Sequence, residues 1–341
     1  MIILNWFVVS IIIVPCRNEE KYIGNCLDSV IAQDYPKDKL EVLVVDGMSE
    51  DGTREVIKDY VLKNPYIKLL DNPSRIVPAA LNIGIKNAHG DIIIRMDAHN
   101  IYEKDYISKC VTYLTKHDVD NVGGIWITLP GNETFIGKSI ALVLSHSFGV
   151  GNAYFRTGSK EPKYVDTVPF GCYKKEVFEK IGLFDEDLVR NQDDEFNLRL
   201  IKNGGKILLV PDIVSYYYAR DSLGKLWKMY FQYGYFKPLV AQKIGAVLTW
   251  RQLIPAIFVG SLIFTGLLSF FSSYFLWLFS LIIGLYLFAN LAFSFSIALK
   301  KGLQLLPFLV ISFATLHFSY GIGYLKGVWD FVVLKGIGRK G

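Results

Sequence analysis

The tripeptide Asp97-Ala98-His99 carries two side chains whose types suit phosphate and metal chemistry. Asp97 follows the mainly apolar run 92–96, where a carboxylate is costly unless something compensates its charge. A divalent cation that bridges two phosphates would compensate it, and carboxylate oxygens are good ligands for Mg²⁺ or Mn²⁺. We therefore expect Asp97 to hold a metal ion, with His99 as a second ligand or a phosphate contact. The alternative is a capping Asp beside a solvent-exposed His.

A second polar stretch, residues 46–53, follows the apolar run 40–45 and precedes a helical pattern. Its glycines permit a tight turn, and Asp46 or Ser49 can hydrogen-bond a nucleotide base or ribose. A turn between a strand and a helix uses Gly and Asp in any case. By itself, the stretch therefore also fits a purely structural role.

Three consecutive acids, Asp193, Asp194 and Glu195, precede a predicted helix over residues 196–202. Carboxylates at the start of a helix are favourable without any function, but three of them exceed what a helix cap needs. A carboxylate next to a reacting hydroxyl would serve as its general base. Both interpretations remain open on this stretch alone.

Alternating strands and helices are predicted to position these residues. Strands are expected at the nearly continuous apolar runs 8–14, 40–46, 67–70 and 91–97, and helical spacing is found over residues 19–32, 53–62 and 77–88. The pattern indicates an α/β fold with a mostly parallel sheet covered on both faces. Ligands bind beyond the carboxyl ends of such strands, which is where the polar stretches stand. Residues 132–166 have weak periodicity and many Gly and Ser, so we expect a loop-rich segment there.

The distribution of charge divides the chain into two parts. No charged residue occurs between Arg251 and Lys300, and residues 252–341 contain six basic residues and one acidic residue. Because the whole chain has a formal net charge of +5, residues 1–251 are neutral overall, and the basic excess is not a nucleic-acid patch. The four cysteines are scattered without metal-ligand spacing, which favours a reduced, cytosolic compartment.

The C-terminal part is predicted to meet and cross a membrane. Residues 222–243 have an amphipathic pattern with aromatic residues beside Lys225 and Lys228, which suits a membrane interface or a face packed on another domain. Hydrocarbon spans take roughly 20 helical residues, and segments 254–271, 276–299 and 303–325 are long enough. The glycine-rich sequence 321–327 follows no predicted strand, so we do not interpret it as a dinucleotide site.

The third apolar segment conflicts with the distribution of basic residues. The positive-inside rule places Lys300 and Lys301 in the cytosol, and a third full span would then place the basic tail outside. A re-entrant or interfacial third segment would keep the tail inside. We expect three spans, with this conflict open.

Seven segments, taken in order, carry a family resemblance. They are Val-Pro-Cys-Arg-Asn-Glu-Glu (14–20), Asp-Gly-Met-Ser-Glu-Asp-Gly-Thr (46–53), Arg75 with Ala-Ala-Leu-Asn (79–82), Arg-Met-Asp-Ala-His (95–99), Phe-Gly-Cys-Tyr-Lys-Lys-Glu-Val-Phe (170–178), Ile-Gly-Leu-Phe-Asp-Glu (181–186) and Gln-Asp-Asp-Glu-Phe-Asn-Leu-Arg-Leu (192–200). Together they resemble the family 2 inverting glycosyltransferases of the GT-A fold, and most of all the membrane-associated group that includes succinoglycan-biosynthesis-type enzymes. No single segment is decisive, but the ordered set is specific.

The resemblance implies a role for each matching residue. Asp97 would hold the metal and the donor diphosphate, Gly171 would let the backbone approach the donor sugar, and Asp193 would be the acceptor base. The nucleotide pocket would be lined by Pro15, Arg17, Glu19, Asp46, Ser49 and Arg75. The metal would stabilise the departing nucleoside diphosphate. Attack from the opposite face would then invert the anomeric carbon.

The chain departs from the family pattern at two positions. The usual metal motif is Asp-x-Asp, and His99 stands at its third position. The Gln-x-x-Arg-Trp motif of processive synthases is absent, and Trp250-Arg251-Gln252 holds similar residues in another order. We therefore expect transfer of one sugar per encounter.

These observations predict a membrane-anchored hexosyltransferase of polysaccharide or glycan biosynthesis. We expect a GT-A catalytic domain over residues 1–220, an interfacial region over 221–251 and a transmembrane region over 252–341. We expect the protein to lie in the cytoplasmic membrane and to cross it several times, with the catalytic domain in the cytosol. Its partners would be a nucleotide-sugar donor, with UDP as the expected nucleotide, a polyprenyl-linked sugar acceptor and membrane lipid, without nucleic acid.

Two other functions compete with this one. A sugar nucleotidyltransferase should carry a basic phosphate-activating loop near its N-terminus, where only Arg17 is present. A catalytically inert membrane structural or transport protein would leave the set of Asp46, Asp97 and Asp193 unexplained.

Overall fold

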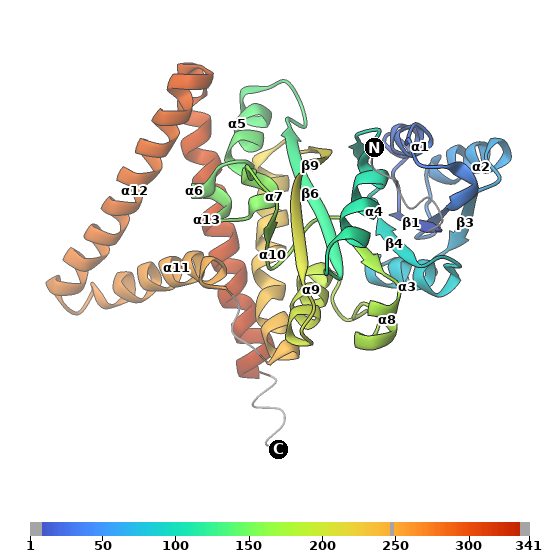
Figure 1. Ribbon diagram of the computed structural model, residues 1–341. Coiled ribbons are helices and arrows are strands. Elements are labelled where there is room, and N and C mark those ends of the chain that lie inside the picture. Colours follow the sequence, from blue (N-terminus) through green and yellow to red (C-terminus); the bar gives the residue numbers. More distant parts are fainter. Residues whose placement is uncertain (1–8, 246–248, 335–341) are drawn as a thin grey trace. The chain divides into compact units, whose positions relative to one another are not determined.

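The computed structural model describes residues 9–245 and 249–334 (Figure 1). Contacts divide the chain into two compact units, one formed by Met1–Ile127 with Gly158–Tyr217 and the other by Thr128–Thr157 with Tyr218–Gly341. The first unit holds most of a nine-stranded sheet, and the second holds the long apolar helices. The segment 128–157 belongs to the helical unit although sheet strands precede and follow it in the sequence.

The parallel half of the sheet follows the predicted alternation. Its strand order is β3-β2-β1-β4, with all three pairings parallel. The strands are β1 (Ser10–Cys16), β2 (Leu40–Asp46), β3 (Ile67–Asp71) and β4 (Ile92–Arg95), and the helices between them are α1 (Ile23–Ile31), the short η1 (Lys37–Lys39), α2 (Thr53–Lys63) and α3 (Val77–Asn87). Val8, where we expected the first strand to begin, lies outside the described residues. The first helix begins at Ile23 rather than residue 19 because residues 17–22 form a loop, in which Glu19 N–H donates to Thr53 at the start of α2.

The side chains of β1 alternate between the two faces of the sheet, and all of them are buried. Ile12 and Val14 lie in the main core cluster with residues of α1, α2 and α4 (Tyr106–Lys116). Ile13 faces α3 so closely that a Cβ added at Gly84 would lie 2.6 Å from its side chain. Successive residues of a strand point to opposite faces, so a fully apolar strand needs helices on both sides.

Antiparallel strands extend the sheet beyond β4 in the order β8-β6-β9-β5, with β7 on β9. These strands are β5 (Asn100–Tyr102), β6 (Asn121–Leu129), β7 (Lys163–Tyr164), β8 (Cys172–Lys174) and β9 (Ile207–Tyr218), with α8 (Glu176–Ile181) and α9 (Gln192–Lys202) between the last two. The pairing of Ile94 with Cys172 places Gly171 beside Arg95, whose N–H donates to the Gly171 carbonyl over 3.1 Å. The architecture confirms an α/β fold of the expected class.

The helical unit contains an element that the sequence analysis assigned to a loop-rich segment. Residues 135–144 form α5 (Phe135–Leu144), which the Thr134 side chain caps by accepting from Gly137 N–H. Gly and Ser residues weakened the apolar periodicity, but α5 buries Ile140, Val143 and Leu144 and packs on α13. The remaining elements are α6 (Ser147–Val150), α7 (Tyr154–Thr157), α10 (Leu223–Ile244), α11 (Trp250–Leu268), α12 (Ser273–Lys301), η2 (Leu303–Leu305), α13 (Leu306–Gly327) and the π-helical turn η3 (Val328–Leu334).

Three of these helices, within the part of the chain that the structure describes, are long and apolar enough to cross a membrane. The glycine-rich sequence 321–327 lies in the third of them, where close packing requires glycine. A Cβ at Gly323 would lie 2.2 Å from the Phe231 carbonyl oxygen, and one at Gly327 would lie 2.1 Å from that of Tyr235. These glycines let α13 approach the backbone of α10.

Candidate active site

The loops that follow β1 and β2 are joined by hydrogen bonds. Asn18 N–H donates to Ser49 Oγ over 2.8 Å, and the Asn18 side-chain oxygen accepts from Glu50 N–H over 3.0 Å. Glu19 N–H donates to Thr53 Oγ1 over 2.8 Å. Because both loops stand at the carboxyl ends of parallel strands, they form one polar surface where this class of sheet binds ligands.

Asp46 is fully buried at the end of β2 and has its charge compensated within the protein. Its carboxylate accepts from Ser49 N–H at 3.0 Å, from Ser49 Oγ at 2.5 Å and from Arg54 Nη1 at 2.6 Å. Arg54 also reaches Asp71 at 2.7 Å, and the hydrogen bonds to Asp71 and Asp46 raise the pKa of its guanidinium. The network holds the Asp46 carboxylate in one orientation, with Ser49 at its outer edge.

A single arginine connects Asp97 and Asp193. Arg95 Nε and Nη2 donate to the two oxygens of Asp97 at 2.8 and 3.1 Å, and Arg95 Nη1 lies 3.4 Å from Asp193 Oδ2. The forked geometry suits a guanidinium, which binds a carboxylate through two parallel hydrogen bonds. Asp97 N–H donates to the Tyr102 hydroxyl over 2.6 Å, which fixes the backbone at this point. Arg95 thus places both carboxylates relative to each other.

The environment of Asp193 favours a proton acceptor. Burial among protein atoms raises the pKa of Asp193, Arg95 lowers it, and the neighbouring Asp194 raises it again. Burial opposes the charge of Arg95, but Asp97 and Asp193 outweigh it and raise the pKa of the guanidinium. The Asp193 side chain keeps 39% of its surface exposed, so this carboxyl remains open to a substrate.

The acids of the 193–195 stretch lie inside a helix rather than before it. Helix α9 begins at Gln192, four residues earlier than the sequence pattern suggested, and the acids form its first turn. Glu195 is paired with Arg199 at 2.7 Å and is buried, so its role is structural. Of the three acids, Asp193 faces Arg95 and the site.

Left-handed backbone conformations at five non-glycine residues accompany these side chains. They are Asn18, Met48, Arg75, Phe170 and Asn191, with φ between 49° and 61°. Each lies in the candidate site or within two residues of one of its members. Such conformations cost free energy and persist where the surrounding structure determines them, which is frequent at functional sites.

The remaining predicted residues take different positions. His99 Nδ1 lies 3.3 Å from Glu19 Oε1, which connects the Asp97 loop to the loop after β1. Arg75 lies 3.4 Å from Glu50 and is exposed, as is Arg17, whose side chain packs on Gly47. Pro15 is buried within β1 beside Val45. A Cβ on Gly171 would lie 2.4 Å from the Tyr173 ring, so no larger residue fits there.

Asp97 and His99 can contribute to a cation site but do not complete one. The described residues contain no group of three or more His, Cys, Asp or Glu side chains able to hold a metal ion. Each Asp97 oxygen keeps a free lone pair beyond its Arg95 hydrogen bond. Mg²⁺ is typically held by one or two carboxylates together with substrate phosphates and water. The donor set therefore fits a cation that shares its ligands with a diphosphate.

Sequence reasoning missed the two arginines that organise the site. Arg54 and Arg95 neutralise Asp46 and Asp97, but their pairing depends on where strand and helix ends meet in space. Arg95 stands two residues before Asp97 in an otherwise apolar strand, and that position was a usable signal. A charge in a buried strand requires a partner, and the next carboxylate along the chain was available.

Comparisons with known proteins identify the family of this chain. The model of glycosyl transferase family 2 matches residues 11–182. A glycosyltransferase from Methanococcus voltae, named dolichyl N-acetyl-alpha-D-glucosaminyl phosphate 3-beta-D-2,3-diacetamido-2,3-dideoxy-beta-D-glucuronosyltransferase, is 35% identical over 93% of this chain and 96% of its own. The succinoglycan biosynthesis protein ExoA of Rhizobium meliloti is 29% identical over 94% and 96%.

A solved structure extends the agreement to the fold. A mannosyltransferase from Pyrobaculum calidifontis, solved with GDP-Man and Mn²⁺, superposes with a TM-score of 0.61 at 20% identity, covering 95% of this chain and 88% of that one. The chain belongs to glycosyl transferase family 2 and is a glycosyltransferase with a GT-A-like catalytic unit followed by apolar C-terminal helices.

Proposed function

We propose that this family 2 glycosyltransferase transfers one sugar from a nucleoside-diphosphate sugar to an acceptor carried by a polyprenyl-type lipid, with inversion. The observation that carries the proposal is the Asp97–Arg95–Asp193 arrangement. In it one guanidinium contacts two carboxylates and holds Asp97 more firmly than Asp193. One carboxylate is bound by both oxygens, and the other touches Arg95 through one oxygen only.

Asp193 is the proposed general base. Its partly buried carboxyl, 39% of which is exposed, would accept the proton of the acceptor hydroxyl as that oxygen attacks the anomeric carbon. Burial of Asp193, which raises its pKa, makes it a better acceptor than an ordinary surface Asp. Arg95 orients Asp193 and limits the rise in its pKa.

Asp97 and His99 are the proposed protein ligands of a divalent cation, Mg²⁺ or Mn²⁺, with phosphate oxygens of the donor completing the site. When bound, the cation supplies stabilisation for the negative charge of the leaving nucleoside diphosphate. The Mn²⁺ in the mannosyltransferase structure supports this assignment by analogy.

The proposed nucleotide pocket is formed by the joined loops after β1 and β2. Ser49 offers hydrogen bonds to the base or ribose, the buried Asp46 holds Ser49 in position, and Gly171 leaves room for the donor sugar. Pro15, Arg17, Glu19 and Arg75 complete the lining. UDP is the expected nucleotide, and GDP is the alternative that the mannosyltransferase complex brings forward.

The apolar helices and the name of one relative support a lipid-linked acceptor. The Methanococcus voltae enzyme is named for a dolichyl-phosphate-linked acceptor, and an enzyme held at the membrane reaches such an acceptor directly. We propose that the catalytic part, residues 1–220, lies on the cytosolic side of a cytoplasmic membrane. An interfacial region, 221–251, would connect it to a multi-pass part, 252–341.

The test is transfer by the full-length protein in detergent, across a panel of UDP and GDP sugars with a polyprenyl-phosphate-linked N-acetylglucosamine acceptor. We expect one donor to give a product that extracts into organic solvent, and we expect EDTA to abolish its formation and Mg²⁺ or Mn²⁺ to restore it. Product found only in the aqueous phase would exclude the lipid-linked acceptor. Full activity in EDTA would exclude the metal.

A further inference from the structure

An aromatic cluster lies beside the carboxylates of the site, within the catalytic unit. Its four rings are Tyr102 of β5, Trp126 of β6, Phe170 just before β8 and Tyr217 of β9. Trp126 stacks on Tyr217 with 4.7 Å between ring centroids, and it lies tilted against Phe170 at 5.2 Å. Tyr102 meets Phe170 edge-on at 5.7 Å. Segments that are far apart in the sequence therefore meet around one tryptophan.

The aromatic cluster contacts the groups that hold the two carboxylates of the site. The guanidinium carbon of Arg95 lies 6.0 Å from the centroid of the Phe170 ring, at the outer range of a cation–π contact. The Tyr102 hydroxyl accepts from Asp97 N–H over 2.6 Å. One ring therefore separates Trp126 from the guanidinium that contacts both carboxylates.

The register of the sheet places Trp126 at the edge where the site lies. Strands β4 and β6 both pair antiparallel with β8, and Ile94 and Val122 share Cys172 as their partner. The two strands therefore run in the same direction. From that common row, Arg95 is one residue and Trp126 four residues farther along, so Trp126 lies about 10 Å beyond Arg95 in the strand direction. It stands past the carboxyl end of β4, where ligands of such sheets bind.

Trp126 differs from the other three rings in its exposure. Tyr102, Phe170 and Tyr217 are buried, whereas Trp126 is partly exposed. The contacts with Tyr217 and Phe170 fix the orientation of the indole, so it loses little conformational entropy when a ligand covers its exposed part. Ligand sites in proteins commonly combine such an aromatic surface with a few polar groups. Here the polar groups are Arg95 and the carboxylates that it contacts.

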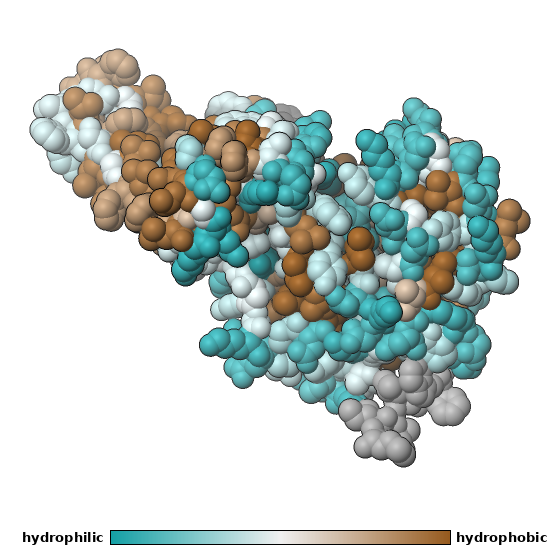
Figure 2. All heavy atoms as spheres, turned by 90° about the horizontal axis from the view of Figure 1, so that it is seen from above, coloured by the Kyte–Doolittle hydropathy of each residue, from teal (hydrophilic) through white to brown (hydrophobic). Residues whose placement is uncertain are grey.

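The surface of the catalytic unit favours a polar ligand. On the face that Figure 2 shows, hydrophilic residues cover most of the part that holds the sheet, whereas apolar residues gather over α11 and α12. A sugar suits a single indole on such a surface, because the hydroxyl groups of a pyranose point outward while its C–H groups form an apolar face. That face covers an aromatic ring, and the hydroxyl groups remain available to carboxylates and water.

We propose that Trp126 binds a sugar ring of the acceptor and that the other three rings of the aromatic cluster hold the indole in place. A hydroxyl of the acceptor then lies at Asp193, and a C–H face of its sugar part covers Trp126. The inference rests on the proposed function and deepens it. It assigns recognition of the sugar of the acceptor, as distinct from its lipid, to the catalytic unit.

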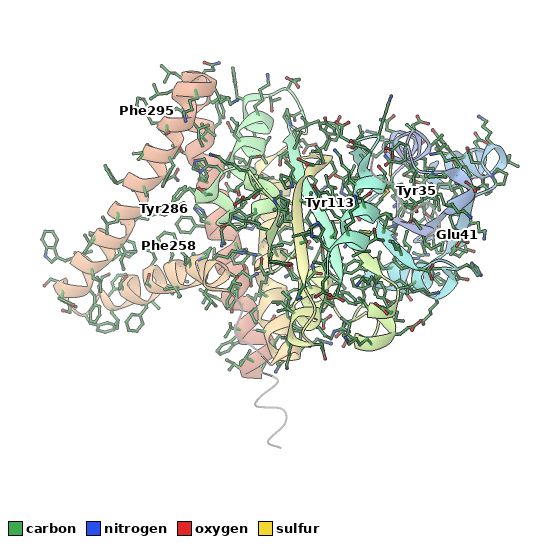
Figure 3. All side chains as sticks on the ribbon, in the orientation of Figure 1. Tyr35, Glu41, Tyr113, Phe258, Tyr286 and Phe295 are labelled. Carbon is green, nitrogen blue, oxygen red and sulfur yellow. The ribbon has the colours of Figure 1, made fainter. Side chains whose placement is uncertain are left out.

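Two substitutions at Trp126 separate sugar binding from core packing. Trp126→Phe keeps an aromatic plane, whereas Trp126→Leu keeps apolar volume against the core and loses the plane. The matched control is Tyr113→Leu, because Tyr113 also packs partly buried on the main core cluster and stacks on His117 at 5.6 Å. Tyr113, labelled in Figure 3, lies near the end of α4, and α4 ends five residues before β6 begins. The control therefore lies near the start of β6 and not at its carboxyl end.

Steady-state transfer to polyprenyl-phosphate-linked N-acetylglucosamine by the full-length protein in detergent tests the proposal. We expect Trp126→Leu to raise the acceptor KM about tenfold and Trp126→Phe to raise it only about twofold. The donor Kd, measured by calorimetry, should be the same in both variants as in the wild type. Tyr113→Leu should lower the melting temperature and leave the acceptor KM unchanged. Equal acceptor KM values in the two Trp126 variants, or a weaker donor Kd in Trp126→Leu, would overturn the proposal.

Tryptophan fluorescence observes the indole itself and does not require Trp126→Leu to fold. A sugar that covers an indole changes its emission, so the sugar-linked acceptor should change the emission of the wild type beyond any effect of polyprenyl phosphate without a sugar. Trp126→Phe should lose this sugar-dependent change. A sugar-dependent change that persists in Trp126→Phe would come from another tryptophan and would overturn the proposal. Absence of transfer by the wild type would contradict the proposed function itself, so the two failures are distinguishable.

Discussion

Asp46 and Asp193 have different carboxylate environments within one catalytic unit. Asp46 is fully buried and receives hydrogen bonds from Ser49 and Arg54. Asp193 is 39% exposed, shares Arg95 with Asp97 and has a raised pKa. A buried carboxylate with every oxygen bound can position a ligand but is not free to move a proton, whereas a partly exposed one with a raised pKa can do so. We therefore assign nucleotide positioning to Asp46 and proton transfer to Asp193.

Asp97 is intermediate between Asp46 and Asp193 in exposure, and its removal should have the largest effect on turnover. Asp97→Ala removes the proposed cation ligand and releases Arg95, so we expect kcat/KM to fall by about 10³-fold, in the range for loss of one electrostatic contact in a transition state. The response to Mg²⁺ and Mn²⁺ should disappear as well. The exposed Asp91, at the other end of β4, provides the control Asp91→Ala, which should keep both activity and metal response.

Removing the charged partner of the buried Asp46 should destabilise the protein. Arg54→Met leaves the Asp46 carboxylate buried without its cation, which should lower the free energy of unfolding by about 3 kcal/mol. Urea denaturation followed by tryptophan fluorescence would measure it. In the control, Lys206→Met removes an exposed surface pair with Asp118, and the free energy of unfolding should stay nearly unchanged because exposed ion pairs contribute little. Equal losses would mean that Asp46 does not depend on Arg54.

Arg95 should affect the pH dependence of the reaction more than the affinity for the donor. In the wild type, the acidic limb of kcat/KM should lie above the ordinary Asp value of about 3.9, because burial raises the pKa of Asp193. Arg95 lowers that pKa, so Arg95→Met should move the limb to higher pH, where more of the base is protonated. Arg95→Lys keeps the charge but not the fork, so it should lower kcat about tenfold without moving the limb. If the acidic limb does not move in Arg95→Met, the ionisation that it reports is not that of Asp193.

Ser49 should give the smallest effect because one hydrogen bond is removed from a network that survives. Ser49→Ala removes the hydroxyl that donates to Asp46 and accepts from Asn18 N–H. A cost of about 1 kcal/mol corresponds to a rise in donor KM of about fivefold. A change in kcat instead of KM would place Ser49 at the reacting centre. The proposed division between nucleotide positioning at Asp46 and proton transfer at Asp193 would then be wrong.

The parallel half of the sheet was predictable because neighbouring residues in the sequence favour the same strand, turn or helix. Runs such as 40–46 are β-branched and apolar and end in a polar turn, so strand, turn and carboxyl-end site all follow from adjacent residues. The neighbourhood of Asp46 and Ser49 was predictable for the same reason. The fold class and the family were confirmed on this part of the chain.

The remaining features depend on contacts between distant residues. The pairing of Arg54 with Asp46 and of Arg95 with Asp193 needs the ends of separate elements to meet, and no spacing rule encodes it. Helix α5 was missed because the helices on which it packs follow much later in the chain. The early start of α9 was missed because the acids of its first turn resembled a preceding loop.

Replacing Asp193 tests the central claim most directly. Asp193→Asn keeps the size of the side chain and its contact with Arg95 but removes the proton acceptor, and Asp194→Asn is the matched control. Donor binding by calorimetry and single-turnover transfer are measured on the same full-length preparations. The account predicts an unchanged donor Kd and transfer slowed by about 10²–10⁴-fold in Asp193→Asn alone. Transfer at the wild-type rate in that variant would contradict it, because the acceptor proton would then leave through another group.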